Sequence, residues 1–296
     1  DFGIFEIGMD KKGEIDYLSK IIKPDVGVIT NISHAHIKNF KNINQIASAK
    51  SEIIKNIKDD GFLILNKDDK FYNFHKQIGL KRNLKILSFS LKNKSATTNL
   101  DSISKEKSKY KISININKQK KYFYLNSCFE NDLKNFLATV TIISIYKNIQ
   151  VLDKNIFYDY KVTHGRGDIV KIKSFKNFFY LVDESYNSNP LSLKSALKNF
   201  DMIEVDNSKK HLVLGDMLEL GKYSKKHHIG IGKSINKTSL KNVNVIGKHV
   251  KWTFSNLNKS KRGIIIKKKS HIIDLIKNSL NNNDYLMIKG SNSTGL

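Results

Sequence analysis

The sequence is poor in cysteine, in arginine and in long apolar runs, and each shortage excludes a class of protein. A single cysteine, Cys128, rules out an internal disulfide bond and is typical of a reducing compartment. No run of 18 apolar residues occurs, which argues against a membrane-spanning helix. We therefore expect a cytoplasmic protein without a membrane span. With 296 residues and 40% apolar residues, the chain is long enough for about two domains with cores of their own.

The shortage of arginine bears on the strong positive charge. The formal net charge is +25, from 52 basic and 27 acidic residues, and such a charge suggests a nucleic-acid-binding protein. Only three of the basic residues are arginines, the side chain that best suits bidentate phosphate recognition: Arg82, Arg166 and Arg262. The lysines are scattered among many Ile and Asn residues, so we interpret them as solvated surface positions and expect no specific nucleic-acid partner. A basic nucleic-acid-binding protein stays as the alternative from another class, and it predicts tight, salt-sensitive binding to duplex DNA.

Apolar runs alternate with helical patterns in the first half of the chain. Strands are expected at Phe2–Ile7, Val26–Ile32, Phe62–Leu65 and Leu84–Phe89, and helices at Glu14–Ile22, Ile43–Ile57 and Asp132–Tyr146. Residues 96–128 alternate apolar and polar side chains, as an antiparallel sheet edge does. The pattern predicts an α/β domain with a mostly parallel sheet, helices on both faces and a small antiparallel edge.

A second alternating series follows the glycine-flanked Arg166 of "VTHGRGD". Strands are expected at Phe178–Asp183, His211–Leu214, Val243–Ile246, Gly263–Ile266 and Tyr285–Ile288, with helices that begin near Pro190, Ser224 and His271. We therefore expect two domains, residues 1–165 and residues 166–296, the second also of the α/β class.

Polar side chains follow the ends of the first two expected strands. Glu6 ends the first strand in "FEIGM", and His34 and His36 follow the second in "TNISHAH". Ligands of open parallel sheets bind at the carboxyl ends of the strands, so these side chains are expected to face one crevice. A carboxylate and an imidazole could bind a divalent cation there, although each is also an ordinary loop residue.

Lys50 lies in the apolar stripe of the helix predicted over Ile43–Ile57. Its stem could cover the core while the ammonium reaches solvent. Alternatively, burial lowers the pKa of the amine, and a neutral amine can react with carbon dioxide to give a carbamate. A carbamate is an anion that a nearby metal ion would favour. The pattern alone leaves both interpretations open.

Several stretches resemble those of a known family. "FEIGMDKKGEIDYLSKIIKPDVGVITNISHAHIKNF" and "IASAKSEI" look like the central domain of the Mur ligases, and "VDESYNSNPLSLKSAL", "LVLGDMLELG" and "MIKGSNS" look like their C-terminal domain. The resemblance covers nearly the whole chain in the correct order. It implies a central ATPase-type domain followed by a Rossmann-like C-terminal domain. The "DESYNSNP" stretch is most similar to the members that use D-alanyl-D-alanine, and the "DNPR" motif of the diaminopimelate-adding members is absent.

The resemblance implies roles for residues of the first domain. Glu6 matches a glutamate that helps to hold the magnesium bridging the ATP phosphates, and His36 matches a histidine that binds a second magnesium. Lys50 matches the lysine that is carbamylated in this family, and would thus be a third metal ligand. Asn135 in "NDLKNFLA" partly matches an asparagine that contacts ATP.

The resemblance also implies roles in the second domain. Arg166 matches an arginine that reaches the nucleotide phosphates and, with Lys50 and His36, would be catalytic. Further nucleotide contacts are expected from the segment that follows the first long strand, at Glu184, Tyr186, Asn187 and Asn189. The Lys-Gly-Ser stretch near the acceptor substrate corresponds to Lys289, Gly290 and Ser291.

The implied reaction is the ATP-dependent formation of an amide bond. The members most similar here join D-alanyl-D-alanine to UDP-N-acetylmuramoyl-tripeptide through an acyl phosphate, in peptidoglycan precursor synthesis. We expect a monomer that uses ATP and two magnesium ions. Another Mur ligase or a folylpolyglutamate-type ligase is the alternative among enzymes.

A phosphate-binding loop of the form GxxxxGK[ST] is missing from the sequence. "GIGKS" at residues 230–234 lacks the first glycine of that pattern, and we predict that it lies in a surface helix. The chain also begins without methionine, inside an apolar run. We therefore expect a fragment that lacks the phosphate-binding loop and the preceding nucleotide-sugar domain, and that is inactive alone.

Overall fold

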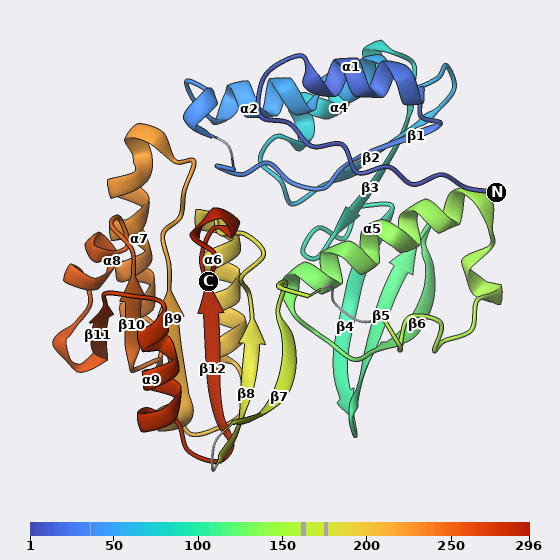
Figure 1. Cartoon of the computed structure of the whole chain (residues 1–296). Helices are drawn as coiled ribbons and strands as arrows, with labels where there is room; N and C mark the ends of the chain where they lie inside the picture. Colours follow the sequence, from blue (N-terminus) through green and yellow to red (C-terminus); the bar gives the residue numbers. More distant parts are fainter. Residues whose placement is uncertain (36, 161–163, 175–176) are drawn as a thin grey trace. The chain divides into compact units, whose positions relative to one another are not determined.

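The computed structural model describes residues 1–35, 37–160, 164–174 and 177–296 (Figure 1). The chain forms two compact units, Asp1–Tyr160 and Lys161–Leu296, and the expected boundary at residue 166 falls just inside the second. Among the helices of the described residues, none combines the length and the apolar character that a membrane crossing requires.

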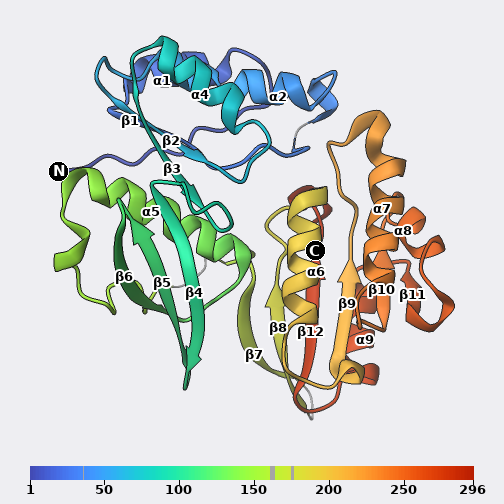
Figure 2. The same cartoon turned by 180° about the vertical axis from the view of Figure 1, so that it is seen from behind.

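Unit 1 is built on one six-stranded sheet. The order is β1-β2-β3-β4-β5-β6, with β1 Val26–Ile29, β2 Phe62–Asn66, β3 Lys85–Ser90, β4 Thr98–Glu106, β5 Lys109–Ile116 and β6 Gln119–Leu125. The first four strands pair in parallel, and β4, β5 and β6 pair antiparallel. The expected parallel sheet with an antiparallel edge is therefore confirmed, and Figure 2 shows the antiparallel strands as a ribbon that extends from the sheet.

Helices cover both faces of this sheet, as expected. They are α1 Glu14–Ile22, α2 Ile43–Lys50, α3 Glu52–Lys55, α4 Tyr72–Lys81 and α5 Glu130–Tyr146. Leu63 faces α4, where it lies close to Gly79, whereas its neighbour Ile64 packs with Phe136 of α5. Successive residues of a strand point to opposite faces, so α4 and α5 lie on opposite sides of the sheet (Figure 1).

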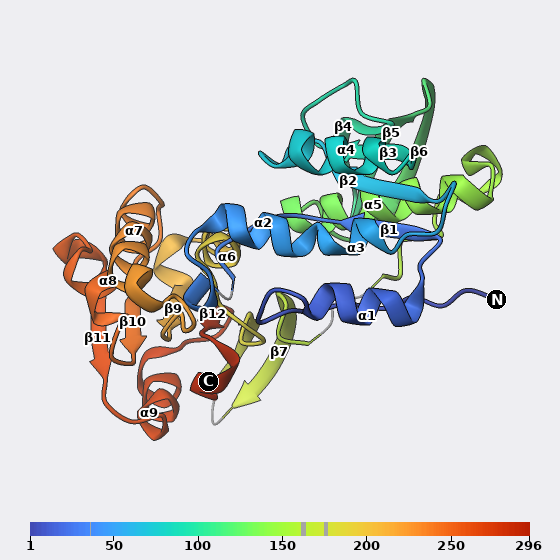
Figure 3. The ribbon, with the colours of Figure 1, turned by 90° about the horizontal axis from the view of Figure 1, so that it is seen from above.

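Two sequence predictions in unit 1 need correction, and one helix was not predicted. The helix predicted over Ile43–Ile57 is two helices, α2 and α3, which lie end to end (Figure 3), and α4 was not predicted. The strand predicted at Phe2–Ile7 is absent, because residues 1–9 are not part of any strand. The side chains of Phe2 and Ile4 are 72% and 96% exposed. An apolar run predicts a strand only where a neighbouring strand offers its backbone hydrogen bonds.

Unit 2 is a second six-stranded sheet, in the order β11-β10-β9-β12-β8-β7. The strands are β7 Asp168–Ser174, β8 Asn177–Asp183, β9 Lys210–Leu214, β10 Val243–Ile246, β11 Arg262–Ile266 and β12 Asp284–Lys289. All pairs are parallel except β7 with β8. The last strand, β12, lies between β8 and β9, so the carboxyl ends of these three strands meet at one edge.

The helices of unit 2 also lie on both faces. They are α6 Pro190–Asp201, α7 Ser224–Asn236, α8 Lys251–Ser255 and α9 Ser270–Ser279. Leu275 of α9 packs with Val213 and Leu286, and Figure 1 shows α9 in front of the sheet, while Figure 2 shows α6 in front of it from behind. The "GIGKS" stretch lies in α7, which confirms the predicted helix; one side of it is not at the surface, because Ile231 and Gly232 are buried.

Candidate functional site

Lys50 is the last residue of α2, and its amine lies at the carboxyl end of β1. The side chain is half-buried, and its Nζ donates a hydrogen bond to the carbonyl oxygen of Asn31, 3.2 Å away. Burial lowers the pKa of this amine, and the Asp69 carboxylate opposes that shift. Asn31 is the one acceptor that the described residues give to this ammonium. The amine is therefore easier to deprotonate than that of an exposed lysine.

Glu6 and His36 are the other two residues expected beside Lys50. Glu6 lies in the irregular segment at residues 1–9, and its side chain is exposed. His36 lies outside the described residues. Asn135 lies on the exposed face of α5, whose buried face carries Leu133 and Phe136. The roles of these three residues stay predictions.

A magnesium site at Lys50 depends on a modification. An ammonium group has no free electron pair for a metal ion, and within the described part of the chain no three His, Cys, Asp or Glu side chains gather as a metal site. The lowered pKa of Lys50 favours the neutral amine, which is the form that a carbamate needs. The donor set therefore fits magnesium only if Lys50 carries a carbamate.

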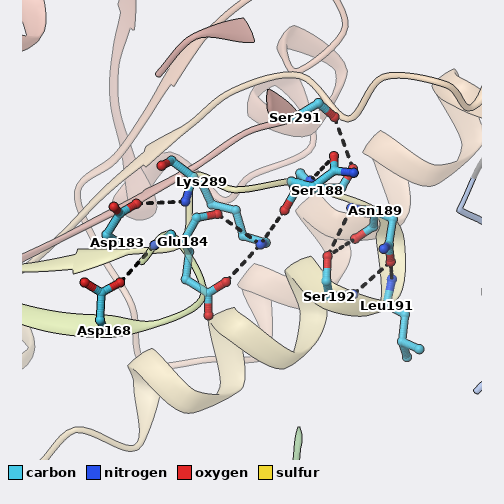
Figure 4. A network of polar contacts seen from close by, with 12 residues as sticks. Asp168, Asp183, Glu184, Ser188, Asn189, Leu191, Ser192, Lys289 and Ser291 are labelled. Carbon is cyan, nitrogen blue, oxygen red and sulfur yellow. Dashed lines mark hydrogen bonds and ion pairs between the residues drawn. The ribbon is translucent and has the colours of Figure 1, made fainter. Parts of the chain in front are cut away.

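In unit 2, Lys289 holds the segment that joins β8 to α6 (Figure 4). Its side chain is 2% exposed, and its Nζ donates to a Glu184 carboxylate oxygen at 3.0 Å, to the Glu184 carbonyl oxygen at 3.2 Å and to the Asn187 carbonyl oxygen at 2.9 Å. An ammonium has three protons, and here each finds an acceptor. Lys289 therefore fixes the backbone of the Glu184–Asn187 segment.

Ser291 joins the loops that follow β8 and β9. Its Oγ donates to the Ser188 carbonyl oxygen at 3.2 Å and accepts the Leu218 backbone N–H at 2.8 Å. Gly290, which lies between Lys289 and Ser291 in the chain, has no room for a side chain, since a Cβ there would lie 2.8 Å from the Thr294 hydroxyl. The Lys-Gly-Ser stretch thus holds the carboxyl ends of the strands together, and whether it also contacts an acceptor substrate stays a prediction.

Arg166 lies in a glycine turn packed on the same segment. Its guanidinium stacks on the ring of Tyr186, 4.3 Å from the ring centre, and both side chains are exposed. The Tyr186 N–H donates to the Gly165 carbonyl oxygen at 3.0 Å, and Gly165 has φ 78°, where a Cβ would lie 2.9 Å from that nitrogen. Glycine is needed at this turn for both reasons. The stack leaves the guanidinium exposed to solvent, and the tyrosine ring limits the movement of the guanidinium.

Asn187 and Asn189, both expected to face a nucleotide, differ in their exposure and in the backbone groups that they contact. Asn189 is the N-cap of α6: its Oδ1 accepts the N–H groups of Leu191 and Ser192, each at 3.0 Å, and Ser192 Oγ accepts the Asn189 N–H at 3.1 Å (Figure 4). Asn187 is exposed at the surface of unit 2, and its carbonyl is held by Lys289. Both amide oxygens therefore accept backbone N–H groups, since Asn187 Oδ1 accepts the Ser188 N–H at 2.7 Å, but Asn187 is exposed whereas Asn189 is half-buried.

Sequence reasoning passed over two further acids at strand ends. The Asp216 carboxylate, 7% exposed, accepts the N–H groups of Lys248, His249 and Val250 at 3.0, 2.9 and 2.7 Å, and so fixes the turn between β10 and α8. Asp69 in unit 1 follows β2 in the same way. A carboxylate soon after a buried strand, as in "LVLGDM" and "LNKDD", is the signal that identifies both.

Comparisons with known proteins cover both units. Residues 1–143 match the family described as Mur ligase middle domain, and residues 165–292 match the family described as Mur ligase, glutamate ligase domain. The chain is 30% identical over 299 residues to the UDP-N-acetylmuramoyl-tripeptide–D-alanyl-D-alanine ligase of Rickettsia prowazekii. It is 30% identical over 298 residues to the ligase of the same name from Buchnera aphidicola subsp. Baizongia pistaciae. Each alignment includes 100% of this chain, which spans 65% and 62% of the two relatives' length.

Solved structures show the same fold. MurF from Acinetobacter baumannii has a TM-score of 0.81 at 23% identity, over 97% of this chain and 61% of that chain. MurF from Thermotoga maritima in complex with ADP has a TM-score of 0.81 at 22% identity, over 97% of this chain and 63% of that chain. Together, the two family matches, the relatives aligned over the whole chain and the two α/β units show that this chain, with a Mur ligase middle and C-terminal domain, belongs to the Mur ligase family.

Proposed function

We propose that the protein is an ATP-dependent ligase that joins D-alanyl-D-alanine to UDP-N-acetylmuramoyl-tripeptide. The observation that carries the proposal is the similarity along the entire chain to two relatives that bear the name of this activity. The arrangement of polar groups agrees with it, because in each unit they gather where parallel strands end, which is where ligands of such sheets bind.

The proposed reaction has two steps. The terminal carboxylate of the tripeptide attacks the γ-phosphorus of ATP, the bond to the ADP oxygen breaks, and an acyl phosphate forms. The amine of D-alanyl-D-alanine then attacks the acyl carbon, phosphate leaves with the electron pair, and the amine loses a proton. Negative charge gathers on phosphoryl oxygens, so a preorganised cation lowers the barrier. Arg166, stacked on Tyr186, is the cation that we assign to this role.

We assign nucleotide contacts to the exposed groups of both units. In unit 2 these are Tyr186 and Asn187, in a segment whose backbone Lys289 fixes. Glu184, partly buried and paired with Lys289, is the further candidate of this segment. Asn135 on α5 is the candidate in unit 1. Asn189 contributes by starting α6 rather than through a free amide. Near the acceptor, the Lys289–Ser291 stretch would act by holding loops in place.

Lys50 is the candidate for carbamylation. The neutral amine attacks the carbon of carbon dioxide, an N–C bond forms, and a proton passes to solvent, which leaves a carbamate anion. The remaining N–H can still donate to the Asn31 carbonyl, so the contact seen at 3.2 Å survives the modification. The carbamate and His36 would hold one magnesium ion and Glu6 another, and these ions would neutralise charge on the phosphates.

The test is a ligation assay on the complete product of the gene. Phosphate release that requires both UDP-N-acetylmuramoyl-tripeptide and D-alanyl-D-alanine supports the proposal. Activity with a different amino-acid acceptor, or with folate and glutamate, would assign the protein to another branch of these ligases. Tight, salt-sensitive duplex DNA binding without any ligation would favour the nucleic-acid alternative.

A further inference from the structure

The three residues after β1 are each held through the backbone by a side chain from elsewhere. Asn66 at the end of β2 donates its amide to the Thr30 carbonyl oxygen at 3.1 Å, and Lys50 at the end of α2 donates to the Asn31 carbonyl oxygen at 3.2 Å. The Asp69 carboxylate accepts the N–H of Ile32 at 2.8 Å. The Thr30–Ile32 segment is neither helix nor strand, so these three contacts set its conformation.

Asp69 is the contact that fixes this segment to a second one. One of its carboxylate oxygens accepts the Ile32 N–H, and the other accepts the Phe71 N–H, also at 2.8 Å, in the turn that leads into α4. Ile32 is 7% exposed, so without Asp69 its N–H would be a buried donor that lacks an acceptor. Hydrogen bonds to a carboxylate are also stronger than those between neutral groups. Asp69 thus bridges two turns at the carboxyl edge of the sheet.

We propose that Asp69 is a positioning residue for the ligase reaction, because it fixes the Thr30–Ile32 segment and so the carbonyl that orients the Lys50 amine. This inference rests on the proposed function, in which Lys50 is a reactive group. The same segment leads on to His34, so a shift at Ile32 would reach that residue through the chain. Asp69 itself needs no contact with substrate in this role.

Asp68 provides a matched control in the same turn. Its carboxylate accepts the Ser90 hydroxyl at 2.6 Å and the Leu91 N–H at 2.7 Å, so it too makes two hydrogen bonds. These bonds tie the end of β2 to the end of β3 and do not involve the Thr30–Ile32 segment. Substitution of either aspartate should therefore lower stability, but only substitution of Asp69 should also disturb the Thr30–Ile32 segment.

The experiment compares Asp69→Ala, Asp69→Asn and Asp68→Ala in the complete gene product. We expect Asp69→Ala to lower kcat by about 10- to 100-fold, the effect of a misplacement of about 1 Å, with the KM for ATP within about twofold. Asp69→Asn keeps one acceptor oxygen and should fall between Asp69→Ala and the unchanged protein. Asp68→Ala should keep kcat within about twofold while it lowers the melting temperature as Asp69→Ala does.

Amide hydrogen exchange gives a readout that does not depend on activity. Exchange at Ile32 should become at least about tenfold faster in Asp69→Ala and stay unchanged in Asp68→Ala. An active enzyme in which Asp69→Ala keeps its kcat, or in which both alanine variants lose kcat equally, overturns the positioning role alone. A protein with no ligase activity before any substitution overturns the proposed function, and the inference with it.

Discussion

Two lysines, one in each unit, lie at the carboxyl ends of parallel strands and differ in how many acceptors they meet. Lys289 is buried and has three acceptors, one of them a carboxylate oxygen. Lys50 is half-buried and has one acceptor among the described residues, the Asn31 carbonyl, while burial lowers its pKa. All three protons of Lys289 are used, so it is well suited to hold structure. Lys50 has donor capacity that the described residues do not use, so it is the better candidate for chemistry.

The comparison is tested most strongly by Lys50→Ala in the complete gene product. We expect kcat to fall by at least about 100-fold, because the carbamate proposed for Lys50 would hold a metal ion worth several kcal/mol of stabilisation of phosphoryl charge. The free energy of unfolding should fall by only about 1 kcal/mol, the net contribution of the one hydrogen bond to the Asn31 carbonyl oxygen that is lost. Kinetics with and without a short carboxylic acid measure the loss and its partial rescue.

Lys210→Ala is the control for that variant. Lys210 is also a buried lysine whose pKa is lowered by burial, and its Nζ donates to the Asp201 carbonyl oxygen at 2.7 Å, at the opposite end of the strands in unit 2. It should lose stability and keep kcat. Full activity in Lys50→Ala would show instead that its ammonium is an ordinary solvated group.

Lys289→Met should have the converse effect, a large loss of stability. It removes the ammonium from the Glu184 carboxylate and from two carbonyl oxygens, and breaking such a buried pair costs about 3 kcal/mol or more. Urea unfolding followed by the fluorescence of Trp252, the single tryptophan, measures this in unit 2. Lys194→Met on the exposed side of α6 should change stability by less than about 0.5 kcal/mol. Equal values for the two variants would contradict the structural role of Lys289.

Mild acid should destabilise unit 2 more than unit 1. Burial lowers the pKa of His211 and His228 in unit 2 and that of His75 in unit 1. The unfolded chain then binds more protons than the folded chain between the folded pKa and about 6.5, so the free energy of unfolding falls as the pH drops through that window. Unfolding at several pH values, followed by Trp252 fluorescence and by circular dichroism, separates unit 2 from the whole chain.

His228→Gln tests the cause of that acid sensitivity. His228 is 1% exposed, and its Nε2 accepts the Met217 N–H at 3.1 Å, a bond that the protonated ring cannot accept. Glutamine can accept this hydrogen bond without titrating, so the variant should lose less stability in acid. An unchanged pH dependence would assign the effect to other groups.

The smallest effects should come from the helix caps. Asn189→Ala removes the cap of α6, and Asn42→Ala removes the cap of α2, where Asn42 Oδ1 accepts the Gln45 N–H at 3.1 Å. Each should cost about 1 kcal/mol of stability. Asn189→Ser retains a cap, so its stability and its KM for ATP should both be close to those of the unchanged protein. A KM that stays raised in Asn189→Ser would show that this amide also contacts the nucleotide.

The sequence predicted most of the fold because periodic patterns are local. Helices α1 and α5 and most strands lie within a few residues of their predicted bounds, and the parallel sheets follow from the alternation of the elements. Helix α4 was missed because the residues that it buries are His75 and Gly79 rather than large apolar side chains, and β7 and α8 were not predicted either. The strand at Phe2–Ile7 was wrong since an apolar run does not supply a pairing partner.

The site was predicted less completely, because the type of a residue does not determine which groups it contacts in the folded protein. The "DESYNSNP" stretch suggested four nucleotide contacts alike, yet Asn189 caps a helix and Glu184 pairs with Lys289, whereas Tyr186 and Asn187 are exposed. The sequence does not distinguish Asp69 from any other acidic residue in a polar turn. Its importance comes from Ile32, 37 residues earlier in the chain, whose N–H it accepts.

By itself, the sequence determined the fold class, the order of most elements and the family, because all three are carried by residues close together in the chain. Only the tertiary structure decided how each polar group is used. Among the residues that the structure describes, it gave Lys289 three acceptors and Lys50 one, since that number depends on which strand ends meet at an edge of the sheet. A lysine far from its partners in sequence becomes structural or reactive according to the acceptors that folding brings to it.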